Sequence, residues 1–203
     1  MNIYTDSSTS IPIQVNEGNK WYTYVLPKEK GLYKINGSAV KKVVVKSDIS
    51  FEGKPSSLND TIIPISTIEA SFKGSNTSKV TSMFSMFQIC ASLTSLDVSN
   101  FDTSNVTDMG LMFGYCRGLT SLDVSNFDTS KVTDMNSMFR GCSGLTSLDL
   151  SGWDMSNVTH TDSMFNGCSN SLTIRMIGCS PETIQKITDV KPSGATIVTR
   201  QTI

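Results

Sequence analysis

The chain has 203 residues, a formal net charge of −1 and only 17% charged residues. It contains no basic block, so the electrostatic footprint of a nucleic-acid-binding protein is missing. No stretch approaches the roughly 18 consecutive apolar residues of a membrane span, and the first residues lack the pattern of a secretory signal. We therefore expect no nucleic-acid partner, no membrane span, and folding in a cytoplasm.

Residues 1–60 contain aromatic and β-branched runs separated by turn-forming segments. This pattern predicts a small β-rich module, which we expect to attach the chain to other proteins. Its densest aromatic cluster is Trp21, Tyr22 and Tyr24. These three side chains form either the core of the module or a docking surface, and the sequence leaves both interpretations open.

From residue 61 onward the sequence repeats itself every 26 residues. The period is clearest in three rows of identical residues: Cys90, Cys116, Cys142 and Cys168; Phe87, Phe113, Phe139 and Phe165; Val80, Val106, Val132 and Val158. A fixed period of this length is typical of a solenoid, in which each unit buries its apolar face only against its neighbours. We predict that these rows are structural ladders inside one elongated core.

Each repeat combines two apolar spacings. Leu93, Leu96 and Val98 end in the alternation expected of a short strand. The following Val106, Met109, Phe113 and Cys116 step by 3, 4 and 3 residues, which predicts one face of a short helical segment. The predicted fold class is an α/β leucine-rich-repeat solenoid over residues 61–176, with short parallel strands alternating with short helical segments, preceded by the small N-terminal β module.

Residues 177–203 depart from the repeat and predict a C-terminal cap. Ser180, Pro181 and Glu182 have the order of a helix N-cap, a first-turn proline and a first-turn acid. Ile184 and Ile187 would face inward from this helix. The remaining residues, rich in threonine, isoleucine and valine, predict a closing edge strand.

The repeat resembles the BspA-like leucine-rich-repeat surface proteins over residues 75–176 or so. The segment Cys90 to Phe113, with its Leu-Thr-Ser-Leu-Asp-Val-Ser-Asn-Phe-Asp core, carries the resemblance. It implies a binding or adhesion role on the exterior of bacteria, or in phage proteins that have acquired the repeat. It implies no catalysis and no defined binding residues.

The cysteine row predicts stacked free thiols that act as small core hydrophobes. Parallel Cβ vectors on adjacent coils have the wrong dihedral angle for a disulfide. Zinc needs converging ligands rather than a row, and His160 is the single histidine of the chain. We therefore predict no metal site here and no cofactor.

A polar row runs along the outward face of the predicted strands. Asp97, Asp123 and Asp149 stack in register, and Arg175 follows one period later, where it can neutralise the end of the row. The candidate binding face consists of Ser95, Asp97, Ser121, Asp123, Ser147, Asp149 and Arg175. We predict a ladder buffered by hydroxyl groups, and a bound cation such as Ca²⁺ on the aspartates is the alternative.

No catalytic constellation is recognisable, because His160 occupies a variant repeat position and the serines belong to the repeat consensus. We expect a non-catalytic binding or structural protein displayed on a particle or cell. The leading hypothesis is a phage virion accessory protein on the virion exterior, joined to other virion or surface proteins through its N-terminal module. The rival is a cell-surface or secreted bacterial adhesin that recognises host protein or glycan on the solenoid face. Self-association into a homo-oligomer fits both.

Overall fold

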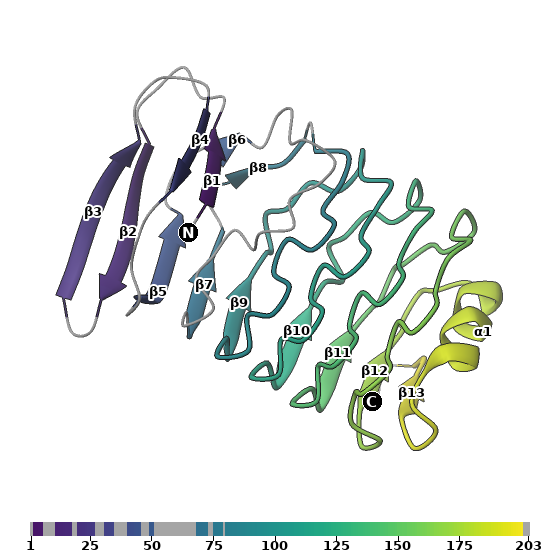
Figure 1. Cartoon of the computed structure of the whole chain (residues 1–203). Coiled ribbons are helices and arrows are strands. Elements are labelled where there is room, and N and C mark those ends of the chain that lie inside the picture. The colour runs from purple at the N-terminus through teal and green to yellow at the C-terminus, as the bar shows by residue number, and fades with distance from the viewer. Residues whose placement is uncertain are drawn as a thin grey trace.

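Parallel strands of three residues recur once per coil along a β-solenoid (Figure 1). The structure is a computed structural model that describes residues 2–5, 11–17, 20–26, 31–34, 40–45, 49–50, 68–72, 75–78 and 80–200. The solenoid strands are β7 (Glu69–Ser71), β9 (Ser95–Asp97), β10 (Ser121–Asp123), β11 (Ser147–Asp149), β12 (Thr173–Arg175) and β13 (Thr196–Val198). The parallel solenoid predicted from the 26-residue period is therefore present.

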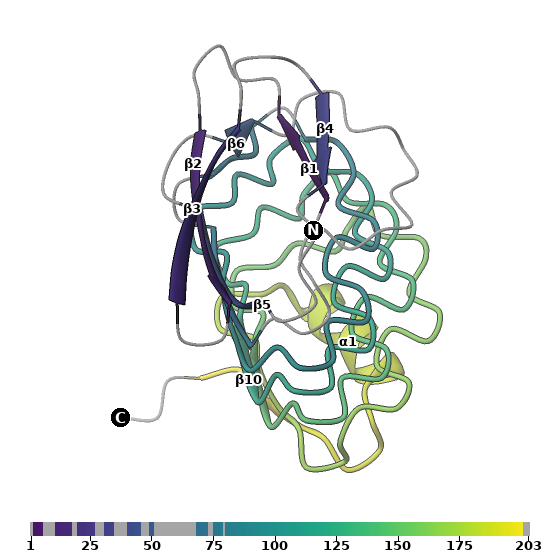
Figure 2. The ribbon, with the colours of Figure 1, turned by 60° about the vertical axis from the view of Figure 1, so that its left-hand side comes forward.

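The remaining strands extend the solenoid sheet in part and otherwise form two separate two-stranded sheets. They are β1 (Asn2–Thr5), β2 (Ile11–Glu17), β3 (Lys20–Leu26), β4 (Gly31–Lys34), β5 (Val40–Val45) and β6 (Ile49–Ser50), followed by the short β8 (Ser75–Asn76). One sheet has the order β3-β2-β5-β7-β9, and β5 pairs with β7 in parallel. Viewed along the coils, β2, β3 and β5 stand at the near end of the stack (Figure 2). A separate N-terminal β module is thus not confirmed, and the boundaries at residues 60 and 176 stay predictions.

The helical half of each repeat is not observed. Met109, Phe113 and Cys116 are buried as predicted, but the chain around them forms successive turns. The backbone N–H of Met109 donates to the carbonyl of Asp134 on the next coil, at 2.9 Å, and that of Phe113 donates to Met138 at 3.0 Å. An α-helix cannot form, because alternate N–H groups bond between coils instead of four residues back.

Residues with positive φ interrupt the helical path at regular intervals. Leu111 has φ 54° and Tyr115 has φ 63°, and their equivalents one or two coils away are also left-handed. A left-handed residue every four positions turns the chain sharply and brings the 3-4-3 spaced apolar side chains inward without a helix. The spacing indicated the buried positions correctly and the backbone conformation incorrectly.

Like residues stack on like residues inside the coils. The rings of Phe87, Phe113, Phe139 and Phe165 follow one another at centroid distances of 5.7, 5.7 and 5.4 Å. Phe101, Phe127 and Trp153 form a second aromatic row, and the Trp153 indole N–H donates to the Val124 carbonyl at 2.9 Å. Such ladders close-pack a narrow interior and leave each coil dependent on its neighbours.

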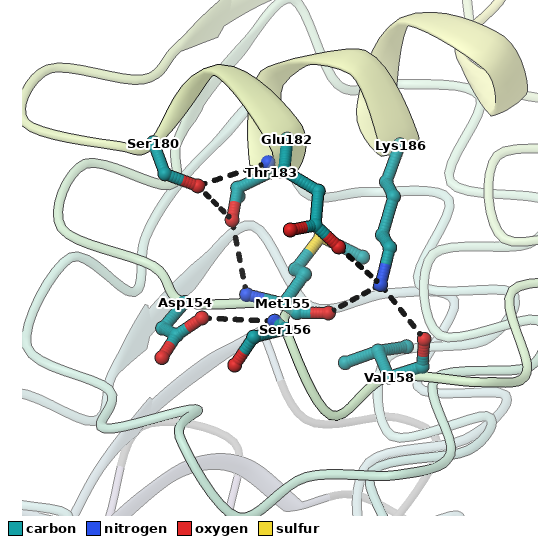
Figure 3. A network of polar contacts seen from close by, with 8 residues as sticks. All are labelled: Asp154, Met155, Ser156, Val158, Ser180, Glu182, Thr183 and Lys186. Atoms are coloured by element: carbon teal, nitrogen blue, oxygen red, sulfur yellow. Dashed lines mark hydrogen bonds and ion pairs between the residues drawn. The ribbon is translucent and has the colours of Figure 1, made fainter.

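The C-terminal end of the stack is covered by α1 (Pro181–Val190), the single helix in the part of the chain that the structure describes (Figure 3). The Ser180 hydroxyl caps it by accepting from the Thr183 N–H, and Pro181 opens its first turn. Ile187 is fully buried against the last coil. Within the described residues, no helix has the length and apolar character needed to cross a membrane.

Candidate functional site

The strands of the solenoid align their polar side chains in register. Asp123 pairs with Asp149 and Asp149 with Arg175 across β10, β11 and β12. Ser121, Ser147 and Thr173 form the neighbouring row. The part of the predicted polar face on β10, β11 and β12 therefore lies on adjacent strands of one parallel sheet, whereas Ser95 and Asp97 lie on β9 in the other sheet.

The aspartates of this face are held by their own turns. Asp123 Oδ1 accepts from both the N–H and the hydroxyl of Ser125, at 3.0 and 2.7 Å. Asp97 makes the same two bonds with Ser99. These Asx turns hold the carboxylates in place with hydroxyl and amide donors.

Arg175 meets the end of the aspartate row. Its Nε lies 3.4 Å from Asp149 Oδ2, and both side chains are partly exposed. Exposed pairs of this kind contribute about 0–1 kcal/mol, so the contact orders the face more than it stabilises the fold. No group of 3 or more metal-ligating side chains converges within the described residues.

The cysteine ladder consists of free thiols. Cys116, Cys142 and Cys168 each donate to a phenylalanine carbonyl of the preceding coil, at 3.1, 3.0 and 3.0 Å. Burial raises the pKa of Cys168 to about 11 and that of Cys142 well above its ordinary value. The hydrogen bond with Cys90, together with burial, raises the pKa of Cys116 strongly. Thiols held protonated in this way are poor nucleophiles.

His160 stands at the end of a second ladder. Parallel bridges join Ser82, Asp108, Asp134 and His160 on successive coils. The ring is exposed, and its Nδ1 lies 2.8 Å from the Thr159 hydroxyl. The histidine therefore occupies a repeat position on the surface, as its sequence register predicted.

A different surface emerges at the turn that precedes each strand. Ile89, Tyr115, Gly141 and Gly167 occupy equivalent positions on four coils, and all have positive φ. Two coils use glycine, the residue suited to this conformation, whereas two place large side chains there. Left-handed backbone costs on the order of 1–3 kcal/mol for a β-branched or bulky residue. The strain at Ile89 and Tyr115 makes this edge a candidate for function.

Two neighbouring hollows lie along the coil edge, and both are lined by Tyr115 and Arg117. One, of about 360 Å³, is lined by Ile89, Ala91, Tyr115 and Arg117. The other, of about 310 Å³, includes Arg140 and Ser143. We call these six residues together the coil-edge groove: Ile89, Ala91, Tyr115, Arg117, Arg140 and Ser143.

Tyr115 is seated in this groove by its neighbours. A Cβ on Gly141 would lie 2.5 Å from Cδ1 of the tyrosine, so the ring occupies the space that this glycine leaves free. The guanidinium of Arg140 lies 5.8 Å from the centre of the ring, in cation–π range. The aromatic side chain is thus positioned on both sides, although the surface itself is open.

Another hollow, of about 480 Å³, lies between residues 161–170 and 190–192. Its lining includes Asp162, Asn166 and Lys191. The Lys191 ammonium group already donates to the carbonyls of Pro192 and Ala195, at 3.4 and 2.8 Å. The cation of this hollow therefore bonds to the turn that follows α1.

The repeated coil is also the part of the chain that matches a known family. A family model described as "Mycoplasma protein of unknown function, DUF285" matches residues 56–174. The chain belongs to this family. Comparisons with curated proteins and with solved structures find no significant match.

The DUF285 region includes the coil-edge groove and the polar strand face up to Thr173, and Arg175 follows it. Sequence reasoning missed the groove, because it followed the positions that repeat and passed over those that vary. Ile89 and Tyr115 stand where later copies have glycine, and Arg117 stands where they have serine. Departures from a strict repeat were the available signal. The side chains of Trp21, Tyr22 and Tyr24 lie outside the described residues, so their predicted attachment role has no structural description.

Proposed function

We propose that the chain is a non-catalytic binding protein displayed on the outside of a cell or particle. The observation that carries the proposal is the contrast between a uniform core and a variable coil edge. The core repeats almost identically from coil to coil, whereas the edge places Ile89 and Tyr115 in strained backbone and exposes Arg117. A rigid scaffold with a few distinctive surface side chains is the usual design of repeat binding proteins.

The chemistry of the other polar rows supports a non-catalytic role. The strand-face aspartates accept hydrogen bonds from their own turns, and burial raises the pKa of the Cys142 thiol well above its ordinary value. Groups held in this way are poorly suited to act as bases or nucleophiles. The resemblance of the repeat to BspA-like leucine-rich-repeat surface proteins supports an exterior location.

Two placements follow from this proposal. The description of the family refers to mycoplasmas, which are cells, and this favours a bacterial surface or secreted adhesin. The five free cysteines favour a virion accessory protein, because phage components fold in a reducing host cytoplasm. In either placement, β3 is the outer strand of its sheet and offers an edge for attachment or self-association.

The test is localisation followed by binding. Antibodies to the chain are applied to intact source cells, to particles released from them, and to the interior fraction after lysis. We expect labelling of intact cells or particles, and saturable binding of the purified labelled chain to the recognised surface. Finding the chain in the interior fraction alone would refute the proposal, and finding it on particles but not on cells would select the virion form.

A further inference from the structure

We infer that the coil-edge groove binds an extended acidic peptide segment that carries an aliphatic anchor residue. The inference rests on the proposed binding function and names its ligand. It is carried by the side chains that line the groove, which are apolar at Ile89, aromatic at Tyr115 and cationic at Arg117, beside the apolar part, and at Arg140 beyond it.

The apolar end selects an aliphatic side chain. Ile89 is 52% exposed, the largest value among the exposed large hydrophobic residues of the described chain. Its hollow is shared with Ala91, Tyr115 and Arg117. A leucine-sized side chain placed there would remove apolar surface from water on both partners. A carbohydrate has no comparable group, and this favours a peptide.

The cationic end selects an acid. Neither Arg117 nor Arg140 has a carboxylate partner within the part of the chain that the structure describes. Two unpaired guanidinium groups on one edge form a local positive field on a chain whose net charge is −1. Arginine binds carboxylates through paired hydrogen bonds, so glutamate or aspartate side chains are the complementary groups.

The backbone of the edge is already saturated. The N–H groups of Ile89, Tyr115 and Gly141 donate to carbonyls of the next coil, at 2.7, 2.6 and 2.7 Å. A partner therefore cannot bind by adding a strand, and recognition depends on side chains. Adjacent coils are spaced by about 4.8 Å, so the groove, which crosses three coils, spans about 10 Å, the length of about three extended residues.

The probe is a fluorescein-labelled peptide in which a leucine precedes two glutamates in a glycine and serine background. Two further probes serve for comparison. They are the same peptide with lysines in place of the glutamates, and a sulfated dextran oligomer. Fluorescence anisotropy measures binding to the full chain and to Ile89→Gly, Tyr115→Gly, Arg117→Glu and Arg140→Glu. The two glycine variants take the residue that suits a positive φ, so they remove the side chain without straining the fold. Arg200→Glu is the matched control, because Arg200 is an exposed arginine outside the groove.

We expect the acidic peptide to bind saturably, and each groove variant to weaken it by about tenfold or more. Arg200→Glu should bind as the unaltered chain does, and Arg117→Glu should gain affinity for the lysine peptide. Three outcomes would each overturn the inference. The glycine variants could bind the acidic peptide as tightly as the unaltered chain does, or the unaltered chain could bind the lysine peptide as tightly as the acidic one. The chain could also bind sulfated dextran and fail to bind the acidic peptide. If the chain binds cells or particles but does not bind the acidic peptide, the proposed ligand is wrong and the proposed binding function stands. Peptide binding by a chain found only in the interior fraction would refute the exterior role alone.

Discussion

The Thr183 hydroxyl oxygen accepts a hydrogen bond from the backbone N–H of Met155 at 3.1 Å, and this contact fastens α1 to the last coil (Figure 3). Earlier coils are joined to the next coil by a different threonine bond, in which the hydroxyls of Thr103 and Thr129 donate to the carbonyls of Asp128 and Asp154. Met155 stands one period after Thr129 and has no hydroxyl. The cap helix therefore supplies a threonine where the repeat ends.

Replacing this threonine should weaken the cap. Thr183→Val leaves the Met155 N–H buried without its acceptor, and we expect the free energy of unfolding to fall by about 1–3 kcal/mol. Thr188→Val on the exposed side of the same helix is the control and should change it by less than about 0.5 kcal/mol. Urea unfolding followed by circular dichroism measures both, and equal effects of the two variants would contradict the capping role.

The aromatic ladder should be most sensitive at its centre. Phe139 stacks between Phe113 and Phe165 and also lies beside Trp153. We expect Phe139→Ala to lower the free energy of unfolding by about 3–5 kcal/mol, because the neighbouring coils cannot close the cavity. Phe139→Leu keeps much of the apolar volume and should cost clearly less in the same urea titration. A negligible loss in the alanine variant would mean that the coils do not share one packed interior.

Gly141 should be more restrictive than a glycine with a similar backbone elsewhere. Gly141→Ala places a Cβ in left-handed backbone and against the Tyr115 ring, whereas Gly152→Ala, at φ 78°, meets only the Ser125 carbonyl at 3.9 Å. Both variants lose about 1 kcal/mol from the backbone, and the Gly141 variant should lose more. This excess should disappear in a Tyr115→Gly background, as a double-mutant cycle in urea can measure. An excess that persists there would mean that the ring does not occupy this space.

The thiol ladder should make stability depend on alkaline pH. Burial raises the pKa of Cys168 to about 11 in the folded chain, from an ordinary thiol value of 9.0 in the unfolded chain. The unfolded chain therefore loses this proton first, so stability is unaffected below about pH 9 and falls as the pH rises to about 11. Thermal unfolding from pH 7 to 11 should record a decline that is smaller in Cys168→Ala. Rapid labelling of Cys116 or Cys142 by a thiol reagent at neutral pH would contradict the buried, protonated ladder.

The aspartate row should not behave as a calcium site. Asp97 and Asp123 accept hydrogen bonds from Ser99 and Ser125, and Asp149 contacts Arg175. We expect isothermal titration of the chain with Ca²⁺ to give no tight binding. Tight binding that Asp123→Asn abolishes would establish the row as a cation site instead of a hydrogen-bonded ladder.

The 26-residue period by itself determined the stacking of the chain. Identical residues one period apart can share a core only if the coils pile up in register, so Phe113 over Phe87 and Asp149 beside Asp123 were predictable. The helix at the end of the stack was also predictable from the sequence, because an N-cap serine at Ser180 followed by Pro181 favours a helix start without any distant contact. The register of Arg175 with Asp149 followed from the same arithmetic.

The tertiary structure alone decided the path of the chain between strands. Turns and a helix bury the same 3-4-3 spaced residues, and the choice depends on hydrogen bonds to the next coil, such as that from Phe113 to Met138, which no local pattern encodes. The coil-edge groove depends on the same turns, because positive φ at Ile89 and Tyr115 is what turns their side chains outward together. A sequence period identifies which residues recur. The packing of one coil on another determines which of the non-repeating residues lie together on the surface.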